Sequence, residues 1–202
     1  MILKPDKQYT FPEIFELNVT IADLLNELGY AYCTQRLDLA RSPIPSEIVQ
    51  QLQDKFYRRS PKISFSTEAA RREFIISQIL WELVDHAQLY IEVEYKTGNE
   101  RLRGNLDYLL RGEHHYIIIE AKNDEMERGF RQLAVELIAA ADHLKLDKLY
   151  GAVTTGEFWR FGLLDREKGT ITRDINSFTI PAGLAELMET LAGLIERGQG
   201  ST

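Results

Sequence analysis

The chain has 202 residues and a net charge of −7, and it is 44% hydrophobic and 27% charged. This composition is that of an ordinary globular protein, long enough to bury a full core as one domain with an extension. No stretch approaches the roughly 18 apolar residues that a membrane span needs. The first ten residues hold no basic region followed by an apolar one, so we expect no signal peptide, no membrane partner and a cytoplasmic location. A single cysteine, Cys33, excludes an internal disulfide and argues against a cysteine zinc site.

The charge is distributed unevenly along the chain. Between Lys55 and Arg111, ten Lys or Arg residues stand against eight acids, a local balance of +2 in an acidic protein. Nucleic-acid-binding proteins usually carry a basic footprint, and this segment permits one. The alternative is that these charges are scattered over a solvated surface.

The N-terminal third, residues 1–65, is expected to form an α/β extension or accessory lobe without recognisable chemistry. Residues 1–18 are mixed, and Pro5 and Pro12 predict that this start is interrupted and partly irregular. Apolar residues at helical spacing from Val19 predict a helix that ends at Gly29. Loose alternation over residues 30–39 predicts a strand. Ser46 is expected to cap a second helix, whose buried stripe is Ile48, Val49, Leu52 and Phe56.

The core domain is expected to occupy residues 66–196 and to begin with a helix capped by Ser66 or Thr67. The inner stripe of this helix is predicted to be Phe74, Ile75, Ile79 and Leu83. Residues 89–96 alternate and predict a half-exposed strand, with Ile91, Val93 and Tyr95 on one side. Gly98 and Asn99 predict the turn into the next strand.

A β-hairpin is the economical interpretation of residues 104–122. Two short apolar runs, Leu106 to Leu110 and Tyr116 to Ile119, flank a turn at residues 111–113. Side chains alternate between the faces of a strand, so Tyr116, Ile118, Glu120 and Lys122 should point one way and Ile117, Ile119 and Ala121 the other. The charged end of the second arm would then emerge where the hydrophobic cover stops.

The remaining elements complete an α/β pattern. Residues 124–145 predict a long helix with the buried stripe Phe130, Leu133, Ala134, Leu137, Ile138, Ala141 and Leu144. Residues 148–154 and 158–164 predict a hairpin in which Trp159 and Phe161 cover the core. An edge strand over residues 171–180 and a helix after Pro181 follow. This order predicts a mixed sheet sandwiched by helices.

The hairpin residues have the types that metal-assisted phosphodiester hydrolysis needs. Asp107 and Glu120 lie on adjacent predicted strands, and two such carboxylates can hold magnesium, which prefers oxygen ligands. The Ala121 carbonyl would add a third oxygen. The metal would stabilise charge on the phosphate and help to generate hydroxide. Lys122 would lie near the attacking water as a positive group that orients it.

At these positions the sequence resembles the PD-(D/E)XK, or restriction-endonuclease-like, nucleases. Asp107 matches the motif aspartate, and Glu120, Ala121 and Lys122 match the (D/E)XK tripeptide, whereas Leu106 replaces the motif proline. The segment STEAARREFI resembles the first core helix of the family and places Glu68 on its acidic position, and Gln132 resembles the glutamine of the following helix. Residues 150–164, YGAVTTGEFWRFGLL, resemble the TNGxxWxF hairpin of the nuclease domain in type I restriction motor subunits. The resemblance covers about residues 67–165.

The resemblance implies a restriction-endonuclease-like mixed central sheet flanked by helices, and a magnesium-dependent nuclease acting on DNA. Manganese is the expected substitute metal. The implied catalytic residues are Glu68, Asp107, Glu120, Lys122 and Gln132, and the implied metal ligands are Asp107, Glu120, Ala121 and Glu68. A homodimer, or docking onto a larger restriction or repair assembly, is compatible with this interpretation.

Each assignment has a simpler alternative. Glu68 is explained equally by the preference for an acid in the first turn of a helix. Asp107 would otherwise be an acid at a strand end paired with an arginine, and Gln132 a solvent-exposed residue on a helix surface. A nuclease fold without catalysis, serving to bind nucleic acid or protein, is the main rival, because fold alone never establishes activity.

Overall fold

The computed structural model describes residues 2–4, 7–97 and 101–197. The strands in this part are β1 (Tyr9–Thr10), β2 (Ala31–Gln35), β3 (Gln88–Lys96), β4 (Leu102–Arg111), β5 (Tyr116–Ala121), β6 (Lys148–Thr154), β7 (Phe158–Asp165), β8 (Thr170–Asp174) and β9 (Phe178–Thr179). The helices are α1 (Phe11–Glu16), α2 (Ile21–Glu27), α3 (Ser46–Arg59), the 3-10 turn η1 (Ser60–Lys62), α4 (Glu68–Arg71), the π-helical turn η2 (Arg72–Ile76), α5 (Ser77–Trp81), α6 (Met126–Leu144) and α7 (Leu184–Arg197). The predicted turn at Gly98 and Asn99 lies outside the described residues.

The strands in this part of the chain form one mixed sheet of nine strands in the order β1-β4-β5-β6-β7-β8-β2, with β3 also pairing with β4 and β9 with β7. The pairs β1–β4, β5–β6 and β2–β8 are parallel. The β5–β6 pair is parallel because α6 carries the chain back between them. The expected α/β fold with a mixed sheet between helices is thus confirmed.

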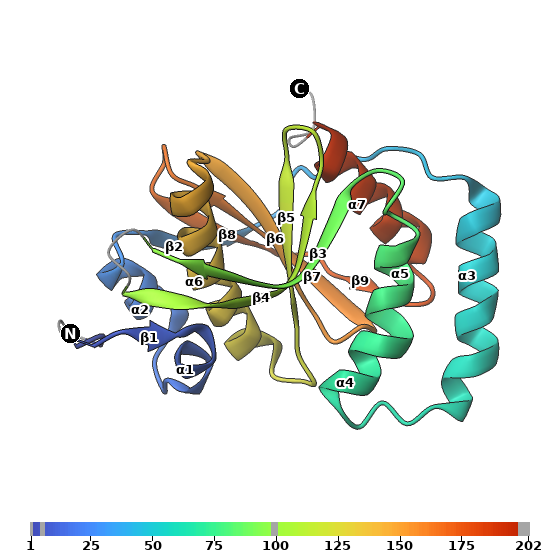
Figure 1. The fold of residues 1–202 in the computed structure, drawn as a ribbon, viewed down its shortest axis with the longest axis horizontal. Coiled ribbons are helices and arrows are strands. Elements are labelled where there is room, and N and C mark those ends of the chain that lie inside the picture. The colour runs from blue at the N-terminus through green and yellow to red at the C-terminus, as the bar shows by residue number, and fades with distance from the viewer. Residues whose placement is uncertain (1, 5–6, 98–100, 198–202) are drawn as a thin grey trace.

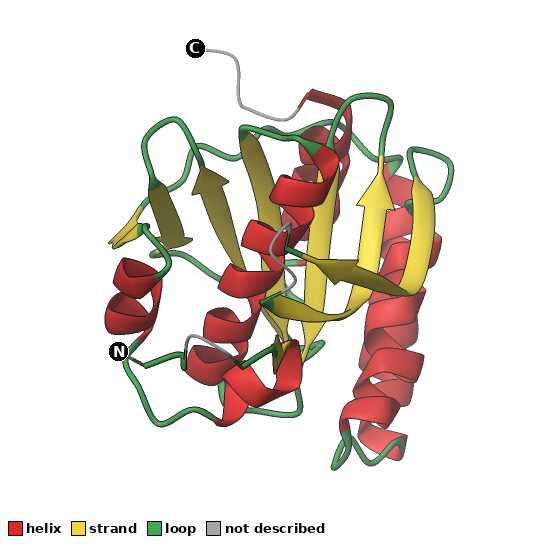
Figure 2. Ribbon diagram, turned by 60° about the vertical axis from the view of Figure 1, so that its left-hand side comes forward, coloured by secondary structure: helices red, strands yellow, loops and turns green. Residues whose placement is uncertain are grey.

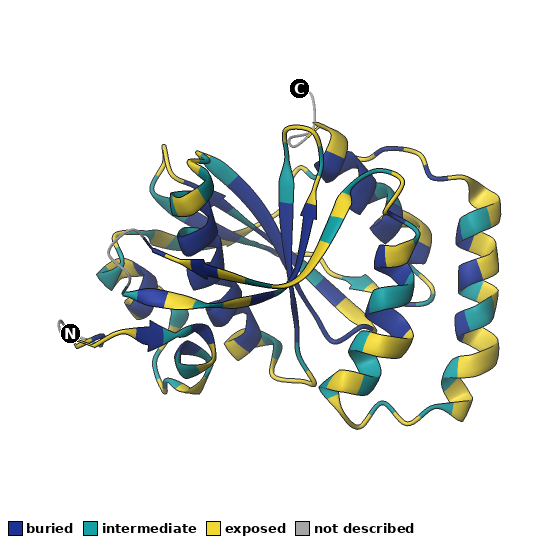
Figure 3. Cartoon of the chain, in the orientation of Figure 1, coloured by how far each residue is buried: buried dark blue, intermediate teal, exposed yellow. Residues whose placement is uncertain are grey.

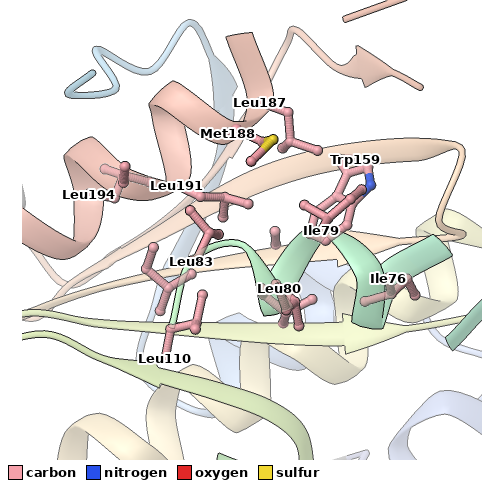
Figure 4. Packing of buried hydrophobic residues seen from close by; sticks show 14 of the residues in the cluster. Ile76, Ile79, Leu80, Leu83, Leu110, Trp159, Leu187, Met188, Leu191 and Leu194 are labelled. Atoms are coloured by element: carbon pink, nitrogen blue, oxygen red, sulfur yellow. The ribbon is translucent and has the colours of Figure 1, made fainter. Parts of the chain in front are cut away.

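Helices cover both faces of the sheet, as the turned view in Figure 2 shows. On one face α6, α1 and α2 pack over a hydrophobic cluster that includes Ile118 and Phe130. On the other face α3, α5 and α7 pack over a second cluster, shown in part in Figure 4. There Trp159 of β7 lies among side chains of α5 and α7, and its ring is fully buried, which confirms its predicted place in the core. Most of the buried residues coloured in Figure 3 belong to these two layers.

The side chains of β5 point alternately to the two faces of the sheet, as predicted. Ile117, Ile119 and Ala121 belong to the cluster beneath α5 and α7. Ile118 belongs to the cluster beneath α6. A strand sandwiched on both faces reads as a continuous apolar run, which is why residues 116–119 show no polar alternation. Glu120 therefore points toward α6.

Several local expectations were wrong for identifiable reasons. Pro12, which was expected to interrupt the chain, lies in the first turn of α1, where its missing N–H costs nothing, whereas the described residues before β1 are irregular as expected. Ser46 does not cap α3, because it is the first helical residue and the N-cap is Pro45. The predicted edge strand is interior, since β8 pairs with both β7 and β2.

Two backbone irregularities occur in these elements, and the first of them shifts a predicted face. The π-helical turn η2 rotates the helix that starts at Glu68, so that Ile76 and Leu80 are buried while Phe74 is exposed. In β3, Glu92 has a φ of 54°, and the pairing with β4 passes from Ile91 to Val93 without it. The register is nevertheless the same on both sides of Glu92, since Ile91 lies opposite Tyr108 and Val93 opposite Leu106, and Ile91 is exposed.

The N-terminal segment contributes to the same sheet as the rest of the chain. β1 pairs with β4 and β2 with β8, so strands before residue 65 flank strands from the predicted core domain. The division at residue 65 stays a prediction. Among the helices of the described residues, none combines the length and the apolar character needed to cross a bilayer.

Candidate functional site

The predicted site residues meet where β4 and β5 leave the hydrophobic layers. The ladder between these strands ends at the pair Tyr108 and Ile119. The next position in this register sets Asp107 opposite Glu120, and directly opposed residues of an antiparallel pair share one face. The backbone N–H of Ala121 donates to Asp107 Oδ2 at 2.8 Å, which ties the two strand ends together.

Glu120 is a buried acid with an incomplete set of partners. Its side chain is 1% exposed. Oε1 accepts a hydrogen bond from Gln132 Nε2 at 2.5 Å and forms an ion pair with Lys122 Nζ. Oε2 is fully buried and has no hydrogen-bond partner among the described residues. A buried carboxylate oxygen without a donor is costly, so this atom points to a positively charged or proton-donating partner.

Gln132 connects Glu120 to a second buried acid, Glu136. Its Nε2 donates both to Glu120 Oε1 and, at 2.8 Å, to Glu136 Oε1. Gln132 and Glu136 lie one turn apart on α6, and residues four apart share a helix face. Both side chains are buried, so the alternative of a solvent-exposed glutamine is wrong. Gln132 Oε1 and Glu136 Oε2 also lack partners among the described residues.

Burial raises the pKa of both buried acids, and repulsion from nearby carboxylates adds to the shift of each. For Glu120 the pKa lies well above its usual value, first because burial disfavours the charge and then because Glu136 and Asp107 repel it. Burial likewise raises the pKa of Glu136 to about 7, and the nearby Asp107 adds to the shift. Two facing carboxyl groups in an apolar layer therefore hold a proton more tightly than either would in water.

Asp107 is bonded on both of its oxygens. Its Oδ1 lies 3.3 Å from Arg72 Nη1, and its Oδ2 accepts the Ala121 N–H. Arg72 also donates to the Tyr108 hydroxyl at 3.3 Å and to Glu92 at 3.1 Å. The alternative that Asp107 pairs with an arginine is therefore observed. The carboxylate is still 17% exposed, which leaves it open to a ligand.

Lys122 and Glu68 lie on the open side of the buried acids. Burial lowers the pKa of Lys122, but the Glu120 carboxylate outweighs this and raises it overall, so its ammonium is charged. Burial raises the pKa of the half-buried Glu68, and the charges of Lys122 and Asp107 act on it in opposite directions. Glu68 occupies the first turn of α4, which Thr67 caps by accepting from Ala70 N. The structure therefore brings Glu68 near the other acids and also agrees with its capping alternative.

A pocket of about 700 Å³ opens beside these residues, and its lining includes Glu68, Lys122 and Gln132. Its opposite wall is the N-terminal segment at residues 7–17. Arg131 of α6 fixes this wall by donating to the backbone carbonyls of Ile14, Phe15 and Val19. The segment that was expected to lack chemistry thus forms half of the pocket next to the proposed catalytic lysine.

The residues fit a hard divalent cation in part. No group of three or more His, Cys, Asp or Glu arranged to hold a metal is found in the described part of the chain. The donors that suit such an ion are the unpartnered Oε2 of Glu120 and the partly exposed carboxylate of Asp107. A ligand set of two carboxylates completed by a backbone carbonyl and water is typical of magnesium, which retains several waters.

Sequence reasoning placed five of these residues together and missed two. Glu68, Asp107, Glu120, Lys122 and Gln132 all interact, directly or through their charges. Glu136 and Arg72 were missed. The signal for Glu136 was present in the sequence, because an acid four residues after Gln132 shares its helix face, beside the apolar stripe of α6. Nothing local in the sequence marked Arg72, which reaches Asp107 through the π-helical turn.

Comparison with known proteins gives little. No family model and no curated protein matches the chain. A chain of the DrdV–DNA complex, solved by cryo-EM, is similar in structure with a TM-score of 0.40 and 12% sequence identity. The likeness covers 71% of this chain and 14% of the DrdV chain, so this chain spans a small part of that protein. What the site does is therefore judged from its own geometry.

Proposed function

We propose that this protein is a metal-dependent nuclease that hydrolyses DNA phosphodiester bonds, on a restriction-endonuclease-like fold. The observation that carries the proposal is the meeting of Asp107, Glu120 and Lys122 at one end of the sheet, with Glu120 buried and one of its oxygens unpartnered. The sequence order of these residues, with Gln132 on the next helix, is that of the PD-(D/E)XK nucleases. The DNA substrate and any restriction or repair role come from that resemblance.

Asp107, Glu120 and the Ala121 carbonyl would hold magnesium or manganese, with Glu68 supporting the ion from α4. Bound there, the ion would supply charge stabilisation at the phosphate and a more acidic bound water. Lys122 keeps its proton beside Glu120, so its ammonium stabilises negative charge developing on the phosphate and orients the attacking water. Gln132 fixes the Glu120 carboxylate by donating to Oε1, which leaves Oε2 free for the ion.

The test is cleavage of plasmid and linear DNA with and without magnesium, in wild type and in Asp107→Ala and Lys122→Ala. We expect cleavage that depends on the divalent ion and that either substitution abolishes. Both variants must retain the wild-type circular dichroism spectrum, so that loss of activity is not loss of fold. Unchanged cutting in both variants would remove the basis of the assignment.

A nuclease-fold module without catalysis, serving to bind nucleic acid or protein, is the second candidate. The observation in its favour is that both oxygens of Asp107 already have partners, Arg72 and the Ala121 N–H. Displacing a guanidinium from a carboxylate competes with metal binding. Calorimetric titration with magnesium or manganese separates the two functions. Heat of binding that disappears in Asp107→Ala favours the nuclease, whereas the absence of any site with DNA or protein binding retained favours the module.

A further inference from the structure

The end of α3 carries a run of basic residues. Residues 55–62, KFYRRSPK, contain four basic residues and no acid in a chain of net charge −7. Arg58, Arg59 and Lys62 are exposed, and among the described residues none of the three pairs with a carboxylate. We call these three residues the α3 corner. Figure 3 shows this end of α3, and the segment that follows it, largely in the colour of exposed residues.

Helix chemistry explains only part of this cluster. Arg58 and Arg59 lie in the last turn of α3, where the helix dipole favours cations. Lys62 lies beyond that turn, in η1, where this explanation does not reach. The next cations along the chain behave differently, since Arg71 pairs with Glu157, and Arg72 with Asp107 and Glu92. The α3 corner is therefore a local positive surplus on an acidic molecule.

The α3 corner lies on the same side of the molecule as the candidate site. Figure 1 shows the end of α3, the start of α4 and the loop after β5 at one end of the fold. α4 and the loop after β5 are in direct contact, because Arg71 of α4 donates to Asn123 of that loop at 3.2 Å. Glu68 follows Arg59 by nine positions in the chain, and an extended chain of nine such steps spans at most about 30 Å. One turn of B-form DNA rises about 34 Å, so a single duplex turn reaches both places.

We propose that the α3 corner binds the phosphate backbone of duplex DNA and holds it within one helical turn of the carboxylate site. This inference rests on the proposed function in one respect, that the DNA so held is the substrate of that site. Arginine and lysine neutralise phosphates and arginine binds them through two parallel N–H groups. A duplex is the better match than a single strand, because single-strand binding relies on several aromatic platforms, and Tyr57 is the one exposed aromatic residue in residues 55–62.

The experiment measures binding in EDTA, so that no cleavage takes place. A fluorescent 20-base-pair duplex is titrated with wild type, with Arg58→Gln/Arg59→Gln/Lys62→Gln, and with the control Lys145→Gln/Lys168→Gln/Arg197→Gln. The control removes three exposed cations, and it includes Arg197 in the last turn of α7 as a match for Arg58. Each binding series is run from 50 to 300 mM salt. Thermal unfolding of both variants shows whether the fold is kept.

Each phosphate contact contributes about 0.9 to the slope of log affinity against log salt. We therefore expect the α3 variant to lose about 2 to 3 units of that slope and on the order of 100-fold in affinity at 0.1 M salt. The control variant should keep the wild-type slope. An unchanged slope in the α3 variant, or an equal loss in the control, would overturn the inference.

The same samples separate this inference from the proposed function. If magnesium produces no cleavage but the α3 variant alone loses duplex binding, the α3 corner is a DNA-binding surface and the nuclease assignment fails. If wild type cleaves duplex DNA and the α3 variant binds and cleaves as well as wild type, the nuclease assignment stands and the inference fails.

Discussion

Replacing Glu136 by glutamine should stabilise the protein above neutral pH. In the folded chain the pKa of Glu136 is raised to about 7 by burial, whereas the ordinary value is 4.5. Unfolding releases this carboxyl to water, where it ionises freely. The raised pKa therefore contributes stability that is present below pH 4.5 and is lost as the pH rises through about 7.

The size of the effect follows from the shift. A difference between 4.5 and about 7, at 1.36 kcal/mol for each pKa unit, costs wild type about 3 kcal/mol of unfolding free energy above pH 7. Glutamine cannot ionise, and its side-chain oxygen can still accept from Gln132 as Glu136 does. The Glu136→Gln variant should therefore be the more stable protein at pH 8 by up to about 3 kcal/mol, or roughly 6 to 12 °C in melting temperature.

The assay is urea unfolding in EDTA at intervals from pH 5 to pH 9. The groups that face Glu136 are Glu120 from β5, Lys122 just after β5, Asp107 from β4 and Gln132 from its own helix, and all of them remain in the variant. Glu47→Gln, which removes an exposed acid on α3, is the control and should follow wild type. Parallel pH profiles for wild type and Glu136→Gln would refute the reasoning, because they would mean that Glu136 ionises alike in both states.

Three further substitutions test other parts of the structure. Gly129→Ala would place a Cβ 2.8 Å from Lys122 Cγ and from Val153 Cγ2, so both side chains must shift, and we expect loss of divalent-dependent cleavage together with a lower melting temperature. Arg131→Leu leaves three backbone carbonyls of the N-terminal wall without their donor and should cost about 3 kcal/mol or more in urea unfolding. Trp159→Ala empties the core between α5 and α7 and should cost about 3 to 5 kcal/mol, whereas an exposed aromatic such as Tyr57 replaced by alanine should cost less than 1 kcal/mol.

The strands of the sheet and the helix α6 that covers it were predictable, because the period of their apolar residues in the sequence largely matches the residues that the structure buries. The stripe of α6 and the apolar run of β5 each follow from one hydrophobic pattern, and the structure buries most of the residues that the pattern names, whereas Ile138, Leu144 and Tyr116 are only partly buried. The helix that starts at Glu68 was not predictable in the same way. Its π-helical turn changes the residue period locally, so a constant 3.6-residue period selects Phe74 in place of Ile76 for the core.

The candidate site was predictable where strand geometry alone places a side chain. Asp107 and Glu120 follow from the register of a hairpin, which sequence can specify. Arg72 and the N-terminal wall were out of reach, because their positions depend on how distant segments pack against the sheet. Arg131 illustrates the limit: its sequence position on α6 says nothing of the three carbonyls, more than a hundred residues earlier in the chain, to which it donates.

The charges of the site tie its stability to its proposed chemistry. Four carboxyl groups, those of Glu68, Asp107, Glu120 and Glu136, act on one another, and Lys122 and Arg72 are the cations that act on them. Buried charge without compensation is too costly to persist, so the excess must be met by protons or by a bound cation. Protonation of these carboxyl groups is enough for a stable module that binds no metal. A divalent ion would in addition be bound by the Glu120 oxygen that has no hydrogen-bond partner among the described residues. The magnesium titration therefore decides between the two proposed functions, because it measures whether a divalent cation binds to these carboxyl groups.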